Sequence, residues 1–193
     1  GFPYAFEGNE AGAGGILVSG GTAYFVRDTN ATLKAGNGDT ADKRDVTLDL
    51  QGHRVKALDL QNFPYNSVTI KNGTIDGIDT EDPAVLILDS VTTNQKVFSD
   101  EFTLTVKGDC VFKSQVNFLG ETQLQGGTFQ NGIWVETGAL ALALLAEGYA
   151  FADADSGKIL NVSNVSIQNR SVKVVEHTCL YTNGNCQCGR ICD

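Results

Sequence analysis

The feature that most constrains the fold is a short burst of alternating apolar and polar residues that recurs along the chain and is often followed by glycine. Such alternation is typical of strands with one buried face. The bursts fall at residues 46–50, 55–60, 68–71, 85–88, 102–106 and 165–167. Helical periodicity is almost absent elsewhere. The pattern therefore predicts an all-β fold.

The spacing of these bursts favours a solenoid, because a solenoid stacks similar coils at a regular sequence interval. Ile70 follows Leu48 by 22 residues, Ile87 follows Ile70 by 17, and Leu104 follows Ile87 by 17. Glycines after several of these strands stand where a coil must turn a corner. The same alternation also suits a meander of hairpins. The interval favours a parallel β-solenoid, and a sandwich is the alternative.

Length and charge narrow the classes of function. A chain of 193 residues fits one domain, and its hydrophobic fraction of 41% is enough to form a buried core. The formal charge of −9 repels phosphate backbones and anionic lipid surfaces. The longest apolar stretch, residues 139–146, is far shorter than the ~20 residues that cross a bilayer. We therefore expect neither nucleic-acid binding nor membrane insertion.

Two sequence stretches carry a resemblance to a known family. Residues 45–53 read DVTLDLQGH and residues 68–75 read VTIKNGTI. They resemble rungs of right-handed parallel β-helix domains of the pectate-lyase-like superfamily, especially those of Gram-positive (Firmicutes) surface proteins. Residues 144–155, 172–175, 177–179 and 183–189 are similar to the closing segment of such cell-wall proteins. The resemblance implies a single-stranded right-handed parallel β-helix and an extracellular, secreted or cell-wall-attached location.

Both ends of the predicted solenoid need covering, because an open coil exposes unpaired backbone groups. We expect residues 1–44 to form an N-terminal cap, with a strand at 22–26 and an exposed loop at 36–43. Alanine and leucine in residues 138–147 favour a short helix over the opposite end. The predicted organisation is a β-helix domain over residues 1–176, cap included, and a cysteine-rich tail over residues 177–193.

Four cysteines gather in that tail: Cys179, Cys186, Cys188 and Cys192. The tail has few aliphatic residues, so cross-links must order it. Two disulfides suit an extracellular chain. The alternatives are zinc, with His177 as a further ligand, and free thiols. The C-x-C pair fits zinc poorly, because structural sites usually use C-x2-C, and disulfides are therefore the preferred interpretation.

The fifth cysteine and the histidines are given simpler interpretations. Cys110 starts a strand and is expected to be a reduced residue in the core. His53 follows a glycine turn and is interpreted as a solvent-facing residue rather than a catalytic one.

Acidic residues gather in the predicted loop that contains Asp76, Asp79 and Asp82. Such a cluster has the hard oxygen ligands that Ca²⁺ prefers, and paired carboxylates are also the acid and base of glycoside hydrolysis. A solvated turn on an acidic protein is the simpler interpretation. The hydrolase motifs of the resembled family are missing from this sequence, so we expect this loop not to be catalytic.

Aromatic residues supply a second candidate binding surface. Trp134 alternates with Ile133 and Val135, so an outward indole follows if those neighbours are core, and Tyr65 is a further candidate for stacking on sugar rings. The sequence thus predicts a non-enzymatic surface module, a rigid scaffold or an adhesin for host or cell-wall glycan or protein. A lyase or hydrolase that acts on polysaccharides, or a degenerate remnant of one, is the alternative. No cofactor is expected apart from the zinc or calcium considered above.

Overall fold

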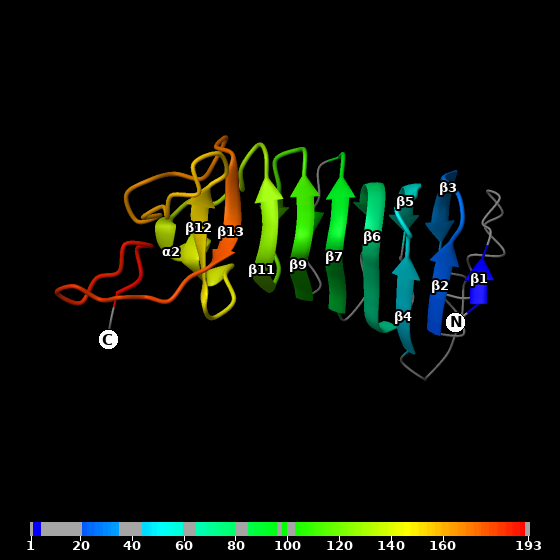
Figure 1. Ribbon diagram of the computed structural model, residues 1–193, viewed down its shortest axis with the longest axis horizontal. Helices are drawn as coiled ribbons and strands as arrows, with labels where there is room; N and C mark the ends of the chain where they lie inside the picture. Colours follow the sequence, from blue (N-terminus) through cyan, green and yellow to red (C-terminus); the bar gives the residue numbers. More distant parts are fainter. Residues whose placement is uncertain are drawn as a thin grey trace.

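The computed structural model describes residues 2–4, 21–34, 44–59, 65–79, 85–95, 98–99 and 103–191. These residues form a parallel β-solenoid of about four turns, with 57% of residues in strands. The strands follow one another along the long axis, from β1 at one end to the orange and red tail at the other (Figure 1). The elements are β1 (Phe2–Tyr4), β2 (Gly21–Phe25), β3 (Thr29–Lys34), β4 (Arg44–Asp49), β5 (Arg54–Asp59), β6 (Tyr65–Asp79), β7 (Val85–Thr93), β8 (Phe98–Ser99), β9 (Thr103–Phe112), β10 (Asn117–Phe118), β11 (Thr122–Phe129), α2 (Gly138–Ala143), β12 (Tyr149–Asp153) and β13 (Val172–Glu176).

The stack has two long faces and one short face. On the first face β2, β4, β6, β7, β9 and β11 pair in parallel. A second face starts with β3 and β5 and continues in the distal half of β6. The short face contains the parallel pair β8 and β10. The all-β parallel solenoid predicted from the alternation is confirmed.

One ladder of buried residues runs through the first face. Leu48 pairs with Ile70, Ile70 with Leu88, and Leu88 with Val106. Each of these side chains is at most 2% exposed. The coil interval is therefore 22 residues and then 18 and 18. The predicted partner of Ile70 was wrong by one residue, because Ile87 alternates with the buried strand positions and is only half-buried.

Three successive coils turn between the two long faces at a residue with a left-handed backbone. Asn72, Ser90 and Gly108 have φ values of 58°, 57° and 66°. Each directly follows the last aligned residue of the first face. Glycine and asparagine adopt this conformation more readily than other residues. The turn signals in the sequence therefore mark the same corner in successive coils.

An outward ladder of opposite charges stands beside the corner. Asp49, Lys71, Asp89 and Lys107 occupy aligned positions on neighbouring strands. The Lys71 ammonium lies 3.8 Å from the Asp49 carboxylate. Opposite charges across neighbouring strands favour this register over alternatives that would bring like charges together.

The N-terminal segment differs from the expected cap. The predicted strand at 22–26 is confirmed as β2, which pairs in parallel with β4. Strand β3 pairs in parallel with β5. Residues 21–34 therefore extend the solenoid by another coil, since backbone pairing continues through them. The loop expected at residues 36–43 lies outside the described residues.

The C-terminal end of the stack is closed by a helix and by a reversal of strand direction. The expected helix is confirmed as α2, and the residues after it return to β11 through hydrogen bonds of 2.8 Å and 3.0 Å. Strand β13 pairs antiparallel with both β11 and β12. The strand expected at residues 165–167 is wrong, because these residues form a bend and an irregular stretch. Within the described part of the chain, no helix has the length and hydrophobicity to cross a membrane.

Candidate metal centre

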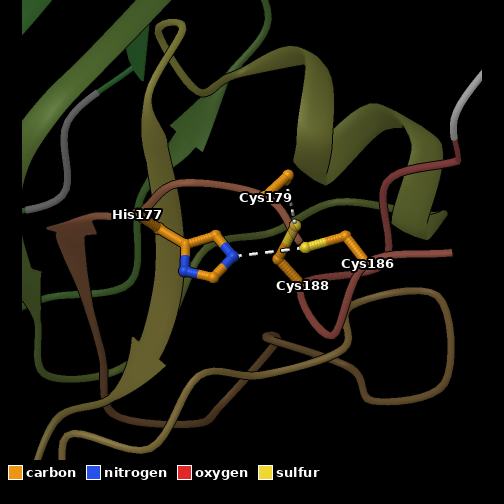
Figure 2. Close-up of side chains that lie close together, drawn as sticks. All are labelled: His177, Cys179, Cys186 and Cys188. Atoms are coloured by element: carbon orange, nitrogen blue, oxygen red, sulfur yellow. Dashed lines mark hydrogen bonds between the residues drawn. The ribbon is translucent and has the colours of Figure 1, made fainter. Parts of the chain in front are cut away.

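The tail begins directly after β13, at the closed end of the solenoid. The backbone amide of His177 donates to the carbonyl of Gly148 at 2.8 Å, which fixes the first tail residue beside β12. His177 and Cys179 stand two residues apart in the segment that follows the strand. Figure 2 shows both side chains directed toward the same point.

Two tight turns bring the remaining cysteines to that point. Asn183 and Gly184 have φ values of 52° and 79°, and Thr182 and Asn185 exchange backbone hydrogen bonds of 2.8 Å and 3.1 Å around them. Positive φ at two successive residues is the signature of a two-residue hairpin turn. The chain therefore reverses direction directly before Cys186.

The second turn is held by Gly189, which has a φ of 100°. Its amide donates to the Cys186 carbonyl at 3.0 Å, and the amide of Cys186 donates to Arg190 at 2.9 Å. A Cβ atom at Gly189 would lie 2.9 Å from the side-chain oxygens of Asn161 and Ser163. Glycine therefore permits both the turn and the close packing of the tail on residues 161–163.

The four ligand atoms of His177, Cys179, Cys186 and Cys188 all lie within 4.8 Å of one another. The His177 Nε2 atom is 3.2 Å from the Cys186 Sγ atom, and the Sγ atoms of Cys179 and Cys188 are 3.5 Å apart (Figure 2). Tetrahedral zinc with its usual bond lengths separates neighbouring ligand atoms by about 3.4–3.8 Å. A cluster of this composition and size could bind a metal ion. Among the described residues no other group of His, Cys, Asp and Glu is gathered in this way.

The cluster is shielded from water on the side of the solenoid. Cys186 and Cys188 are 3% and 1% exposed and pack with Ala150 of β12, with Ile159 and Cys179 partly buried beside them. Thiol groups are weak hydrogen-bond donors and acceptors, so this contact among three of them gains little by itself. Metal coordination would give their convergence a stabilising role.

The thiols have unequal environments. Burial raises the pKa of the Cys179 thiol, but hydrogen bonds with Cys186, Arg190 and Cys188 outweigh burial and lower that pKa to about 7. Burial raises the pKa of Cys188 to about 11, and the neighbouring thiols act in the same direction. Once one thiol of the cluster is ionised, its charge opposes the ionisation of the next, and a divalent cation would reverse this opposition.

The preferred prediction of two tail disulfides does not agree with the structure. Cys179, Cys186 and Cys188 have free thiols, and the separation of 3.5 Å between the Cys179 and Cys188 sulfurs exceeds a disulfide bond of about 2.05 Å. The C-x-C spacing does not keep Cys186 and Cys188 apart, because the ligand atoms of both cysteines lie in the same cluster. Cys192 lies outside the described residues. Cys110 is confirmed as a free thiol in the core, 1% exposed.

Arg190 is a residue of this centre that the sequence reasoning missed. Its Nη1 atom lies 3.8 Å from the Cys179 sulfur and 4.0 Å from the Cys188 sulfur. The available signal was an arginine between Cys188 and Cys192 in the cysteine-rich tail. A guanidinium beside thiolates compensates part of their negative charge.

Among the acidic candidates, only Asp76 has a side chain that the structure describes. Asp76 is buried, and its carboxylate accepts hydrogen bonds from the Arg54 guanidinium and, at 2.7 Å, from Asn94. The hydrogen bonds from Arg54 are the main reason that the pKa of Asp76 is lowered. Asp79 ends β6, but its side chain is not described, and Asp82 lies outside the described residues.

His53 has an acidic neighbour that the sequence did not indicate. Its Nδ1 atom lies 3.3 Å from the Asp28 carboxylate, which also accepts a hydrogen bond of 3.0 Å from the Arg54 amide. The contact joins two coils that are 25 residues apart in sequence. This position gives the pair a structural role in holding neighbouring coils together.

Of the two aromatic candidates, Trp134 and Tyr65, only Trp134 has a side chain that the structure describes. Trp134 is 45% exposed while Ile133 is fully buried, so the expected outward indole is confirmed. It lines a groove with Leu119 and Leu140. Tyr65 is the first residue of β6, and its side chain lies outside what the structure describes.

Comparisons with known proteins do not add a family to this picture. No family model, no curated protein and no solved structure matches the chain significantly. The β-solenoid is therefore established by the structure alone, and the His177, Cys179, Cys186 and Cys188 cluster is a candidate metal site on its geometry.

Proposed function

We propose that this chain is a non-enzymatic β-solenoid module whose C-terminal end is closed by a structural zinc centre. The observation that carries the proposal is the convergence of three sulfurs and one imidazole nitrogen within 4.8 Å, against the last strands of the stack. Sulfur and imidazole ligands select zinc over calcium or magnesium, which prefer oxygen. A centre with four protein ligands leaves no open position for substrate, so its role is structural.

The solenoid itself supports a scaffold role. A ladder of buried aliphatic residues continues from Ala23 in β2 to Leu124 in β11, and one hydrophobic core links them. Stacked coils give length and rigidity without a cavity at the centre. In this proposal the module belongs to a secreted or cell-wall-attached protein of the superfamily that its rungs resemble, where it spaces or presents binding surfaces as a scaffold or adhesin.

The pairing of Asp76 argues against the enzymatic alternative. A catalytic acid needs a proton to give near neutral pH, whereas Arg54 and Asn94 favour the ionised form of Asp76. We expect neither lyase nor hydrolase activity on pectic, xylan and glucan polysaccharides. Lyase activity is measured by the formation of unsaturated products, and hydrolase activity by the formation of new reducing ends. Cleavage that disappears in Asp79→Asn or Asp82→Asn would overturn the non-enzymatic assignment.

Metal analysis of the purified chain tests the zinc centre. The protein is loaded with zinc under reducing conditions, desalted and measured for metal content, and native mass spectrometry is recorded on the same sample. We expect one zinc ion per chain in the wild type and in the matched control Cys110→Ala, and its loss in Cys186→Ser and in Cys179→Ser.

Mass spectrometry of the non-reduced protein separates the competing arrangement. A metal-free chain that has lost four hydrogens would carry two disulfides, which requires Cys192 as the fourth partner. That result would replace zinc by disulfides as the closure of the tail and overturn this part of the proposal.

A further inference from the structure

A groove lined by apolar side chains and by two glutamates lies beside the short face of the solenoid, and it shares no lining residue with the cysteine cluster. Its volume is about 530 Å³. One wall is formed by Leu119 and neighbouring residues between β10 and β11, another by Trp134 and Glu136, and the third by Leu140 and Leu144 of the α2 segment. Three separate parts of the chain thus create one surface.

The walls are fixed to the solenoid by backbone hydrogen bonds. The amide of Trp134 donates to the Val116 carbonyl at 2.8 Å, and the amide of Leu124 donates to the Leu144 carbonyl at 2.8 Å. The hydroxyl of Thr137 caps α2 by accepting from the Leu140 amide at 3.2 Å. A groove with anchored walls loses little conformational entropy when a ligand binds.

Its apolar side chains are unusually exposed. Leu119 is 64% exposed, Leu140 52% and Trp134 45%. These are three of the seven large hydrophobic residues that are exposed in the described part of the chain, and all three line this groove. Apolar residues that gather at one exposed place mark an interaction surface, whereas scattered ones need no explanation.

The charge around the groove is of one sign. Glu121 and Glu136 are exposed at its edge, and none of the described residues that line it is a lysine or arginine. A second copy of the chain would bring these carboxylates and a second charge of −9 against them. Electrostatic complementarity therefore disfavours self-association and favours a basic partner.

We propose that the groove binds a polypeptide segment of a partner protein that carries an apolar side chain next to lysine or arginine. The apolar side chain packs between Leu119 and Leu140, and the cation lies on the Trp134 ring within reach of the two carboxylates. A glycan fits less well, because its hydroxyl groups would face the two leucines without hydrogen-bond partners. The inference rests on the adhesin role proposed above and names the kind of partner that it takes.

Selection from a random peptide library displayed on phage tests this inference directly. The probe is a library of nonapeptides, bound to the zinc-loaded wild-type chain after depletion on Trp134→Ala. We expect enriched sequences in which an apolar residue neighbours lysine or arginine. A synthetic peptide of the enriched sequence should change the fluorescence of Trp134, which is the only tryptophan in the chain.

Matched variants show whether the groove carries the binding. We expect Leu140→Ser and the double variant Glu121→Gln with Glu136→Gln to weaken the peptide by about tenfold or more. The controls Leu180→Ser and the double variant Glu147→Gln with Glu176→Gln remove exposed groups of the same kinds elsewhere and should bind as the wild type does. Circular dichroism confirms that each variant is folded.

Three outcomes would overturn the inference. They are the absence of an enriched sequence, enrichment without basic residues, and equal weakening in the control variants. A further outcome is that neutral or pectic oligosaccharides change the fluorescence of Trp134 and peptides do not. The partner would then be a glycan, and the proposed adhesin role would remain. Loss of zinc or detection of cleavage instead concerns the proposed function, because neither depends on the groove.

Discussion

At the scale of single residues, Arg190 has a proposed effect on zinc affinity that one substitution can measure. Zinc with three thiolates and a neutral imidazole carries one net negative charge, and the Arg190 guanidinium lies 3.8 Å from the Cys179 sulfur. Outer groups of this kind typically change metal affinity by about 10–100-fold. We expect Arg190→Gln to weaken zinc binding by about tenfold in a chelator competition.

Lys158→Gln is the matched control for that measurement, because Lys158 is an exposed cation outside the cluster. It should bind zinc as the wild type does. Equal affinities of Arg190→Gln and Lys158→Gln would show that the guanidinium does not stabilise the metal-bound thiolates.

Cys110 gives a second prediction at this scale. Burial raises the pKa of its thiol to about 11, so only about 0.1% is thiolate near pH 8. The reactive form is thus rare as well as inaccessible. We expect iodoacetamide to label Cys110 only after unfolding, as read by peptide mass spectrometry. Labelling at the same rate in the native and the denatured chain would contradict its place in the core.

Asp76 predicts a dependence of stability on pH. Hydrogen bonds from Arg54 lower the pKa of Asp76 below its unfolded value of 3.8. A lowered folded-state pKa stabilises the fold above the unfolded value, and the stabilisation is lost as pH falls through the folded value. We expect Asp76→Asn to reduce the free energy of unfolding more at about pH 7 than at about pH 3.

Urea denaturation at the two pH values measures that difference, with Glu147→Gln as an exposed control. A destabilisation by Asp76→Asn that is the same at both pH values would mean that the ionised carboxylate contributes nothing beyond its packing.

At the scale of strands, the alternation in sequence predicts the coils but not their register. Leu86 and Leu88 point inward while Ile87 points outward, and all three are aliphatic. Because the outward residue is also aliphatic, the sequence alone does not distinguish the correct register from one shifted by a single residue. Backbone pairing and the aligned corner at Ser90 select the correct one.

This register predicts unequal effects at adjacent positions. Leu88 is fully buried, so Leu88→Ala should cost about 2–5 kcal/mol of the free energy of unfolding. Ile87→Ala removes a half-buried side chain of the outer face and should cost clearly less. Both values come from urea denaturation. A larger loss at Ile87 than at Leu88 would contradict the register.

The closure of the stack shows what the sequence cannot predict. Alternation marks a strand but does not give its direction, so the antiparallel pairing of β13 with β11 and β12 was not foreseen. Residues 165–167 alternate as a strand does, yet only Ile167 among them is buried. Backbone hydrogen bonds with distant residues decide these cases, because short segments have weak local preferences.

The candidate site was also predicted only in part: the sequence indicated its location but not its geometry. Cysteine counts pointed to the tail from sequence alone, since five cysteines with four in one segment is a strong local signal. The geometry required the turns at Asn183 and Gly189, and the second turn packs closely on residues 161–163. The groove had only Trp134 as a signal, because Leu119 and Leu140 come from separate segments.

At the scale of the whole molecule, the proposed zinc centre would complete the end of a stack that otherwise stops at β12. The solenoid core runs without interruption to Val174 in β13, and the tail adds a second small cluster around Ala150 of β12. In this account zinc holds a segment that lacks enough apolar residues to fold alone. Binding energy at such sites becomes folding energy, because the unfolded segment has no preformed site.

X-ray absorption spectroscopy at the zinc edge of the loaded full chain tests this account most directly. The account predicts one tightly bound zinc ion per chain, surrounded by three sulfur atoms at about 2.3 Å and one nitrogen atom at about 2.0–2.1 Å. Substitution of His177 by alanine should remove the nitrogen and leave the sulfurs. A first shell without sulfur, or a chain that retains no zinc and carries disulfides between the tail cysteines, would contradict it.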